Sequence, residues 1–297
     1  MTALAKPSHT NVAAVALADK TARMTSRRLH SIQRYVEMYL HSYGIGGECS
    51  IYSMSDPANF YTGLVADLYE PLAGGITDSS RFIKFVEKHG EPALEICCGT
   101  GLPLLDLIDA GLDVEGLDAS NDMLEICQAK ARKRGLRVTL HHAKMQSFKA
   151  VRGFRSAYIA NGSITLLPSD ADLRQTLRTI IGCLVPGGAV LIDLDMPDID
   201  SLRKYIGTFR ETRHEGCRIR VGMTHLEWCE EGRDLIIKLR YERISPQGEM
   251  ESIDRLWSRK IWSPDQLCEQ LVNSGFEIEE VEELDDGIIQ VCASVVT

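Results

Sequence analysis

The stretch Glu95-Ile-Cys-Cys-Gly-Thr-Gly101 decides the fold, together with the residues on either side of it. Ahead of it, residues 92–94 begin a short apolar run that predicts a buried strand. Behind it, residues 102–109 predict a helix that ends at Gly111. A strand that turns through small residues into a helix presents free backbone N–H groups, and glycine lets a ligand approach the main chain. The sequence therefore predicts that this loop binds a ligand.

A second strand is predicted at residues 112–118, and it ends in an acid, Asp118, 23 positions after Glu95. An acid at the tip of the second strand is placed to accept hydrogen bonds from a ribose diol. A glycine loop alone would be weak evidence, because such loops are common. The loop, the helix, the strand and the acid together predict a site for a nucleoside-containing cofactor.

Residues 94–118 resemble the cofactor site of the class I S-adenosylmethionine-dependent methyltransferases, and the likeness extends more loosely over about residues 60–295. Glu95 matches the family's acid, and Gly99 and Gly101 match its second and third glycines. Cys97 stands where the first glycine is usual, so we expect the backbone there not to need a positive φ. The resemblance implies that S-adenosylmethionine is the cofactor and that the reaction is methyl transfer, but it leaves the acceptor open.

The resemblance also implies which residues surround the cofactor. Tyr61 and Tyr69 are eight residues apart, close enough to one helical face to cover the cofactor together. The alternative is that both tyrosines simply pack against a helix. Lys144 stands where the family often has an acid that binds the adenine amino group, and a charged lysine cannot accept that bond. We therefore expect backbone groups or another side chain to read adenine. The predicted cofactor-binding residues are Tyr61, Tyr69, Glu95, Cys97, Gly99, Thr100, Gly101, Asp118, Ala119, Met123, Met145 and Asn161.

The whole pattern predicts an α/β fold with a Rossmann-like, seven-stranded, mostly parallel sheet and a C-terminal antiparallel hairpin at residues 276–283 and 288–295. The hairpin favours a methyltransferase over a nicotinamide enzyme, whose sheet is all parallel. Alternating polar and apolar residues predict an inserted antiparallel β meander, which we interpret as a substrate cover. The predicted regions are an N-terminal helical extension and cap (1–90), the core (91–197 and 258–297) and the insert (198–257).

Four residues are candidates for contact with the methyl acceptor: Tyr69, Asn161, His225 and Glu227. Asn161 follows the fourth strand, whose carboxyl end borders the ligand crevice. His225 and Glu227 share a strand face at spacing two. An amine acceptor needs alignment, whereas a hydroxyl or carbon acceptor also needs a base. The leading interpretation is a small-molecule N-methyltransferase of specialised metabolism. The alternatives are O- or C-methylation, a catalytically silent fold that binds a partner, and a nicotinamide oxidoreductase.

Composition narrows the partners further. The formal net charge of −9 disfavours nucleic acid, which would require a basic face. Nine cysteines without a C-x-x-C pair indicate reduced thiols rather than a disulfide framework or structural zinc, and we expect no metal site. No apolar run is long enough for a membrane span, and the N-terminus lacks a signal-peptide block, so we expect a cytoplasmic protein. The sequence is compatible with a homodimer.

Overall fold

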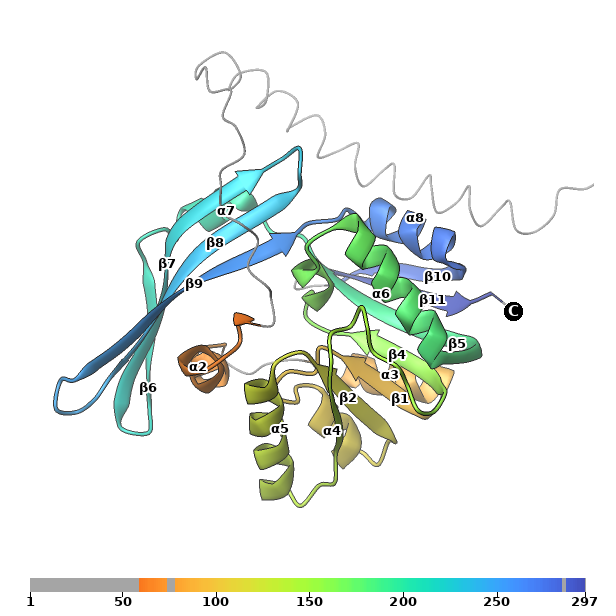
Figure 1. The fold of residues 1–297 in the computed structure, drawn as a ribbon, viewed down its shortest axis with the longest axis horizontal. Coiled ribbons are helices and arrows are strands. Elements are labelled where there is room, and N and C mark those ends of the chain that lie inside the picture. The colour runs from red at the N-terminus through yellow and green to blue at the C-terminus, as the bar shows by residue number, and fades with distance from the viewer. Residues whose placement is uncertain (1–58, 74–77, 285–286, 297) are drawn as a thin grey trace, which may run out of the picture. The chain divides into compact units, whose positions relative to one another are not determined.

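The structure is a computed structural model that describes residues 59–73, 78–284 and 287–296 (Figure 1). All of these residues lie within one compact unit of the chain. The first 58 residues of the predicted N-terminal extension lie outside the described residues.

The core is a seven-stranded sheet with the strand order β10-β11-β5-β4-β1-β2-β3. Strands β1 to β5 are parallel, and β11 runs antiparallel to both β5 and β10. The predicted fold class is confirmed, and the final hairpin has the predicted bounds. The strands are β1 (Ala93–Ile96), β2 (Val114–Asp118), β3 (Thr139–His142), β4 (Phe154–Ile159), β5 (Leu184–Asp195), β10 (Phe276–Glu283) and β11 (Ile288–Val295).

Helices cover both faces of this sheet. Helices α6 and α8 bury leucines against one face, and α3, α4 and α5 bury apolar residues against the other. The cap of α8 is a capping box, in which Ser263 and Gln266 bond each other's backbone N–H groups. The described helices are α2 (Leu64–Ala73), α3 (Ser80–His89), α4 (Leu104–Asp109), α5 (Asn121–Lys133), the short η2 (Ser163–Leu166), α6 (Asp170–Cys183), α7 (Ile199–Arg203) and α8 (Pro264–Ser274).

A second, antiparallel sheet follows β5 and α7, in the order β6-β7-β8-β9. Its strands are β6 (Phe209–His214), β7 (Cys217–Cys229), β8 (Asp234–Ile244) and β9 (Met250–Lys260). Strand β9 therefore continues three residues beyond the predicted end of the insert at residue 257. Helix α2 packs on this sheet through Leu64 and Leu68, and it lies between the sheet and the core (Figure 1).

Among the described cysteines, seven are free thiols and four of these are buried. Cys229 is disulfide-bonded, so the prediction that the cysteines are reduced is wrong at this position. None of the described helices is both long enough and apolar enough to cross a membrane.

Candidate active site

The loop after β1 has a positive φ at three positions, Cys97, Gly99 and Gly101. Gly99 has φ 51°, which glycine adopts without strain, but Cys97 has φ 63°. The prediction that Cys97 needs no positive φ is therefore wrong. The chain must turn immediately after β1 to stay against β2, where the Cys98 N–H donates to the Leu117 carbonyl (2.9 Å). This position costs a non-glycine residue about 1–3 kcal/mol, and such strain concentrates at ligand sites.

Asp118, at the tip of β2, is oriented by the loop beside it. One carboxylate oxygen accepts from the Gly99 N–H (2.9 Å), and the other accepts from the Ser120 N–H (2.8 Å). Burial raises the pKa of Asp118, and these backbone N–H groups partly offset the rise. Each oxygen retains a second lone pair. Asp118 is thus held in place before any ligand binds, with acceptor capacity to spare.

Two adjacent cavities lie at the carboxyl ends of the parallel strands. The first, which we call the apolar cavity, is a slot beside Asp118 whose walls are largely aliphatic. Ala119, Met123 and Met145 contribute to these walls. Its lining residues are Tyr61, Tyr69, Cys97, Gly99, Leu117, Asp118, Ala119, Ser120, Met123, Ala143, Lys144, Met145, Gln146, Ser163, Leu166 and Leu167.

The second cavity, the polar cavity, shares several walls with the first, including Tyr61, Tyr69 and Gly99. The two are therefore parts of one cleft. The polar cavity extends past Asn161 to the second sheet. Its remaining lining residues are Glu70, Cys97, Cys98, Thr100, Leu102, Asn161, Gly162, Ser163, Thr165, Leu166, Asp195, Trp257 and Arg259.

Asn161 reaches this wall because the chain leaves β4 through a left-handed turn. Its φ is 55°, and its backbone N–H donates to the buried carboxylate of Asp193 (2.9 Å). The next residue, Gly162, also has a positive φ, and a Cβ there would lie 2.7 Å from the Asp195 Cβ. Glycine is therefore required where β4 and β5 end side by side, and the turn projects Asn161 into the cleft.

Arg259 from β9 is the main charged group that the second sheet places in the polar cavity. Its side chain is only 4% exposed, and one terminal nitrogen lies 2.8 Å from an Asp195 carboxylate oxygen. Its Nε donates to the Thr165 hydroxyl (2.9 Å), and its guanidinium lies 4.9 Å from the centre of the Trp257 ring. The second sheet is thereby bonded to the core at the floor of the cleft.

Hydrogen bonds with residues of the core hold both ends of helix α2 beside the cleft. Glu70 accepts hydrogen bonds from Thr100 in the loop and from Lys130 on α5. Asp122 accepts from the Gly63 N–H (2.6 Å) at the other end of the helix. Tyr61 and Tyr69 pack edge to face in this region, with ring centres 5.6 Å apart. Burial is the main cause that raises the pKa of both phenols, so both are protonated near neutral pH.

Comparison with known proteins decides the identity of this cleft. Residues 93–188, which hold the loop, Asp118 and Asn161, match the family model described as "Methyltransferase domain". The chain contains a methyltransferase domain. Its fold is that of a solved S-adenosylmethionine-dependent methyltransferase from Clostridium acetobutylicum, which superposes with a TM-score of 0.62 at 14% identity and covers 78% of this chain and 98% of that one, as the resemblance in the sequence implied.

Curated relatives and solved structures agree with this assignment. The dTDP-3-amino-3,6-dideoxy-alpha-D-glucopyranose N,N-dimethyltransferase of Streptomyces fradiae is 32% identical over 145 residues, which cover 46% of this chain and 55% of that protein. The glycine/sarcosine N-methyltransferase of Aphanothece halophytica is 33% identical over 120 residues, covering 39% and 45%. The chain thus spans about half the length of the curated relatives it matches.

Among solved structures, Streptomyces venezuelae DesVI superposes with a TM-score of 0.62 at 20% identity, covering 78% of this chain and 98% of that one. The sugar N-methyltransferase KedS8 from Streptoalloteichus gives a TM-score of 0.62 at 19% identity, covering 86% and 99%. At these identities the structures establish a shared fold.

The cleft of the methyltransferase domain fits the cofactor of its class. The aliphatic walls of the apolar cavity suit a flat adenine ring, and Asp118 can accept from the two ribose hydroxyls. A Cβ on Gly99 would lie 3.3 Å from the Met123 side chain, so glycine keeps the loop open to close approach. When bound, S-adenosylmethionine supplies an electrophilic methyl group.

Two predicted cofactor residues do not line either cavity. Glu95 is fully buried and accepts a hydrogen bond from the Tyr158 hydroxyl (2.8 Å), and burial raises its pKa well above the ordinary value. Gly101 packs instead of binding, because a Cβ there would lie 2.7 Å from the Cys127 sulfur. Both residues therefore support the loop by packing in the interior, away from the cavity walls.

His225 and Glu227 are also absent from the described walls of the cleft. The pairing of β7 with β8 shifts register between Met223 and His225, and this shift reverses the alternation of faces. Before it, residues such as Val221 face inward; after it, Leu226 does, and His225 is exposed. The sequence reasoning instead missed Trp257 and Arg259, although their spacing of two on one strand was a usable signal.

Proposed function

We propose that this protein transfers a methyl group from S-adenosylmethionine to the amino nitrogen of a small molecule, and that the acceptor is an amino sugar. One observation carries the proposal: the described walls of the polar cavity hold ionisable groups that already have partners or keep their protons. Glu70 is paired with Lys130, and Asp195 is paired with Arg259. The raised pKa of Tyr61 and Tyr69 keeps both phenols protonated.

These groups favour an amine over a hydroxyl acceptor. A neutral amine attacks through its own lone pair and can lose its proton to water after transfer, so the protein need only align it. A hydroxyl acceptor requires a base within about 2.6–3.2 Å of its proton. The protonated phenols of Tyr61 and Tyr69 can donate hydrogen bonds and exclude water, but they cannot serve as that base near neutral pH.

The chemistry of the polar cavity suits a sugar. Trp257 and Tyr61 offer aromatic surface against which a pyranose ring can pack. Asn161 and Ser163 offer donors and acceptors for hydroxyl groups. Curated relatives of the methyltransferase domain include two enzymes named for dTDP-linked amino sugars, which supports the same class of acceptor. The net charge of −9 supports a small acceptor over nucleic acid.

The test is a transfer assay with isotopically labelled S-adenosylmethionine and a matched pair of acceptors. One acceptor is a dTDP-3-amino-3,6-dideoxy sugar, and the other carries a hydroxyl in place of the amine. We expect label only in the amino sugar, with one or two methyl groups on nitrogen by mass spectrometry. Glycine and sarcosine form a third arm for small amino acids. Transfer to the hydroxyl compound, or to glycine alone, would refute the proposed acceptor.

A further inference from the structure

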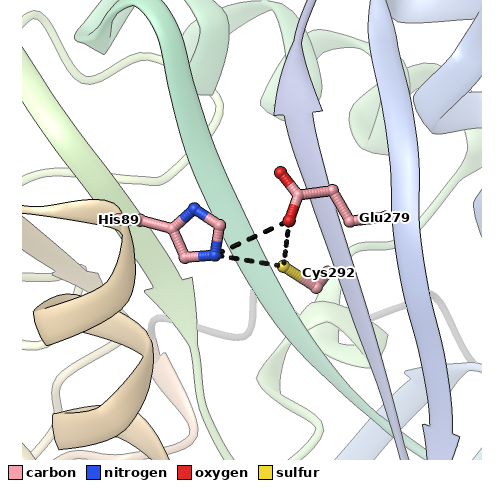
Figure 2. A group of neighbouring side chains, drawn as sticks. All are labelled: His89, Glu279 and Cys292. Atoms are coloured by element: carbon pink, nitrogen blue, oxygen red, sulfur yellow. Dashed lines mark hydrogen bonds and ion pairs between the residues drawn. The ribbon is translucent and has the colours of Figure 1, made fainter.

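Three potential metal ligands meet outside the cleft, on the α3 side of the sheet (Figure 2). They are His89 at the end of α3, Glu279 on β10 and Cys292 on β11. The His89 Nε2 lies 3.8 Å from the Cys292 sulfur and 3.7 Å from a Glu279 oxygen. That oxygen lies 3.9 Å from the sulfur. Figure 2 shows the three side chains pointing toward one another.

The three atoms form a nearly equilateral triangle whose edges are about 0.3 Å longer than the ligand-to-ligand edges of a tetrahedral zinc site. The centre of such a triangle lies at an edge divided by the square root of three, about 2.2 Å from each corner. Zinc bonds are about 2.0–2.1 Å to histidine nitrogen, about 2.3 Å to thiolate and about 2.0–2.2 Å to carboxylate. We propose that His89, Glu279 and Cys292 bind one Zn²⁺ ion, with a water molecule as the fourth ligand.

Each ligand is placed by a separate local feature. The pairing of β10 with β11 shifts register between Ile278 and Glu280, so Glu279 is an extra residue in the ladder. Such a bulge re-aims the side chain that it carries, here toward Cys292. The His89 ring packs on Phe85, with ring centres 4.8 Å apart, which restricts the orientation of the imidazole.

The donor set determines which ion fits. One nitrogen, one sulfur and one oxygen suit a borderline-soft ion such as Zn²⁺, whereas Mg²⁺ and Ca²⁺ prefer oxygen ligands. Without metal, burial and the nearby Glu279 raise the pKa of the Cys292 thiol to about 12, so zinc must displace its proton. Lys88 lies 3.3 Å from the same Glu279 oxygen, but its side chain is 62% exposed and can turn into water.

The location gives the site a structural purpose. Strand β10 is the outermost strand of the seven-stranded sheet, and it pairs with β11 alone. A zinc ion would bond both strands of this hairpin to α3. Because an ion that binds only the folded chain stabilises it, zinc should raise the melting temperature of the protein. None of the three ligands lines the cleft, so this inference does not depend on the proposed function.

The experiment uses the full chain, treated with a chelator and then desalted. Co²⁺ is titrated as a spectroscopic probe, and Zn²⁺ is then used to displace it. We expect one equivalent of Co²⁺, a thiolate-to-cobalt charge-transfer band and displacement by Zn²⁺ but not by Mg²⁺. Cys292→Ser should abolish the band, and Cys268→Ser, which changes a half-buried thiol on α8, should keep it.

Glu279→Gln is a second test that does not depend on Cys292→Ser being folded. Its partly exposed side chain can lose its charge without leaving a cavity, so the variant should fold. It should weaken Zn²⁺ binding by more than about 10-fold, since loss of an outer-shell partner alone costs about 10–100-fold. Each variant is compared with the parent by circular dichroism. The absence of the charge-transfer band in the parent, or its persistence in folded Cys292→Ser, would overturn the proposal.

Discussion

The two halves of the cleft are built in different ways. The apolar cavity is formed by the loop after β1, the tip of β2 and the turns that follow β3 and β4, and its key polar group, Asp118, is held by backbone N–H groups. The polar cavity depends on side chains from the second sheet, Trp257 and Arg259. Parallel topology fixes the first half, whereas the register of an antiparallel sheet fixes the second. The apolar cavity therefore does not depend on the identity of the methyl acceptor. The side chains of the polar cavity can differ from one acceptor to another.

Helix α2 belongs to both halves. Its Glu70 bonds the loop and α5, while Leu64 and Leu68 pack against Ile219 and Tyr241 of the second sheet. Deletion of the whole insert would therefore uncover α2 as well as the acceptor site. Point variants separate the two halves more cleanly.

The largest effect should follow from the apolar half. Asp118→Ala removes the acceptor for the ribose hydroxyls and also the partner of two backbone N–H groups. The loss of hydrogen bonds to a charged group costs about 1.5–3 kcal/mol, or roughly 10–150-fold in cofactor affinity. Isothermal titration with S-adenosylhomocysteine measures it. Asp109→Ala, at the exposed end of α4, is the matched control, and equal affinity in the two variants would contradict the site.

The next effect belongs to the polar half. Arg259→Leu leaves Asp195 and Thr165 without their donor, and an unsatisfied group costs about 1–3 kcal/mol. The value of kcat/KM for the acceptor should fall by roughly 5–150-fold, while cofactor affinity changes by less than about 0.5 kcal/mol, because Arg259 lines the polar cavity and not the apolar one. Steady-state kinetics and titration distinguish these results.

Arg240→Leu is the control for this variant, since Arg240 is a partly exposed strand residue paired with Asp254. Arg259→Lys, which retains the charge but loses the planar fork, should fall between the parent and Arg259→Leu. An equal loss of cofactor and acceptor binding would show that the two halves are not separable in this way.

The contrast between the halves also explains how far the sequence could predict the structure. The loop, Asp118 and the final hairpin follow from glycine spacing and strand ends, which are local signals. His225 and Glu227 do not line the cleft because a register shift after Met223 exchanges the two faces of β7. Alternation of polar and apolar residues alone does not reveal such a bulge. The expectation for Cys97 is wrong because the path of the chain directly after β1 requires a positive φ, although a non-glycine residue disfavours it.

A smaller effect on both halves should come from α2. Glu70→Gln weakens the bonds to Lys130 and Thr100, but Glu70 and Lys130 are 29% and 24% exposed, so solvent screens the pair. We expect a loss of about 1 kcal/mol, or roughly fivefold, in both cofactor affinity and acceptor KM. Glu125→Gln on α5, where the carboxylate accepts a hydrogen bond from Asn121 of the same helix (2.6 Å), should leave both unchanged. A defect in one ligand alone would show that α2 serves only one half.

The smallest effect should come from Lys144, although it lines the apolar cavity beside the adenine slot. A charged lysine has no lone pair for the adenine amino group, so it cannot supply the contact that an acid at this position would make. Lys144→Ala should therefore change the affinity for S-adenosylhomocysteine by less than about 0.5 kcal/mol, the range of ordinary surface substitutions. Lys144→Asp adds the missing acceptor and should tighten binding instead, by up to about 1.5 kcal/mol. If Lys144→Ala loses more than about tenfold, the lysine binds the cofactor directly, and recognition in the apolar half is not left to the backbone and aliphatic walls.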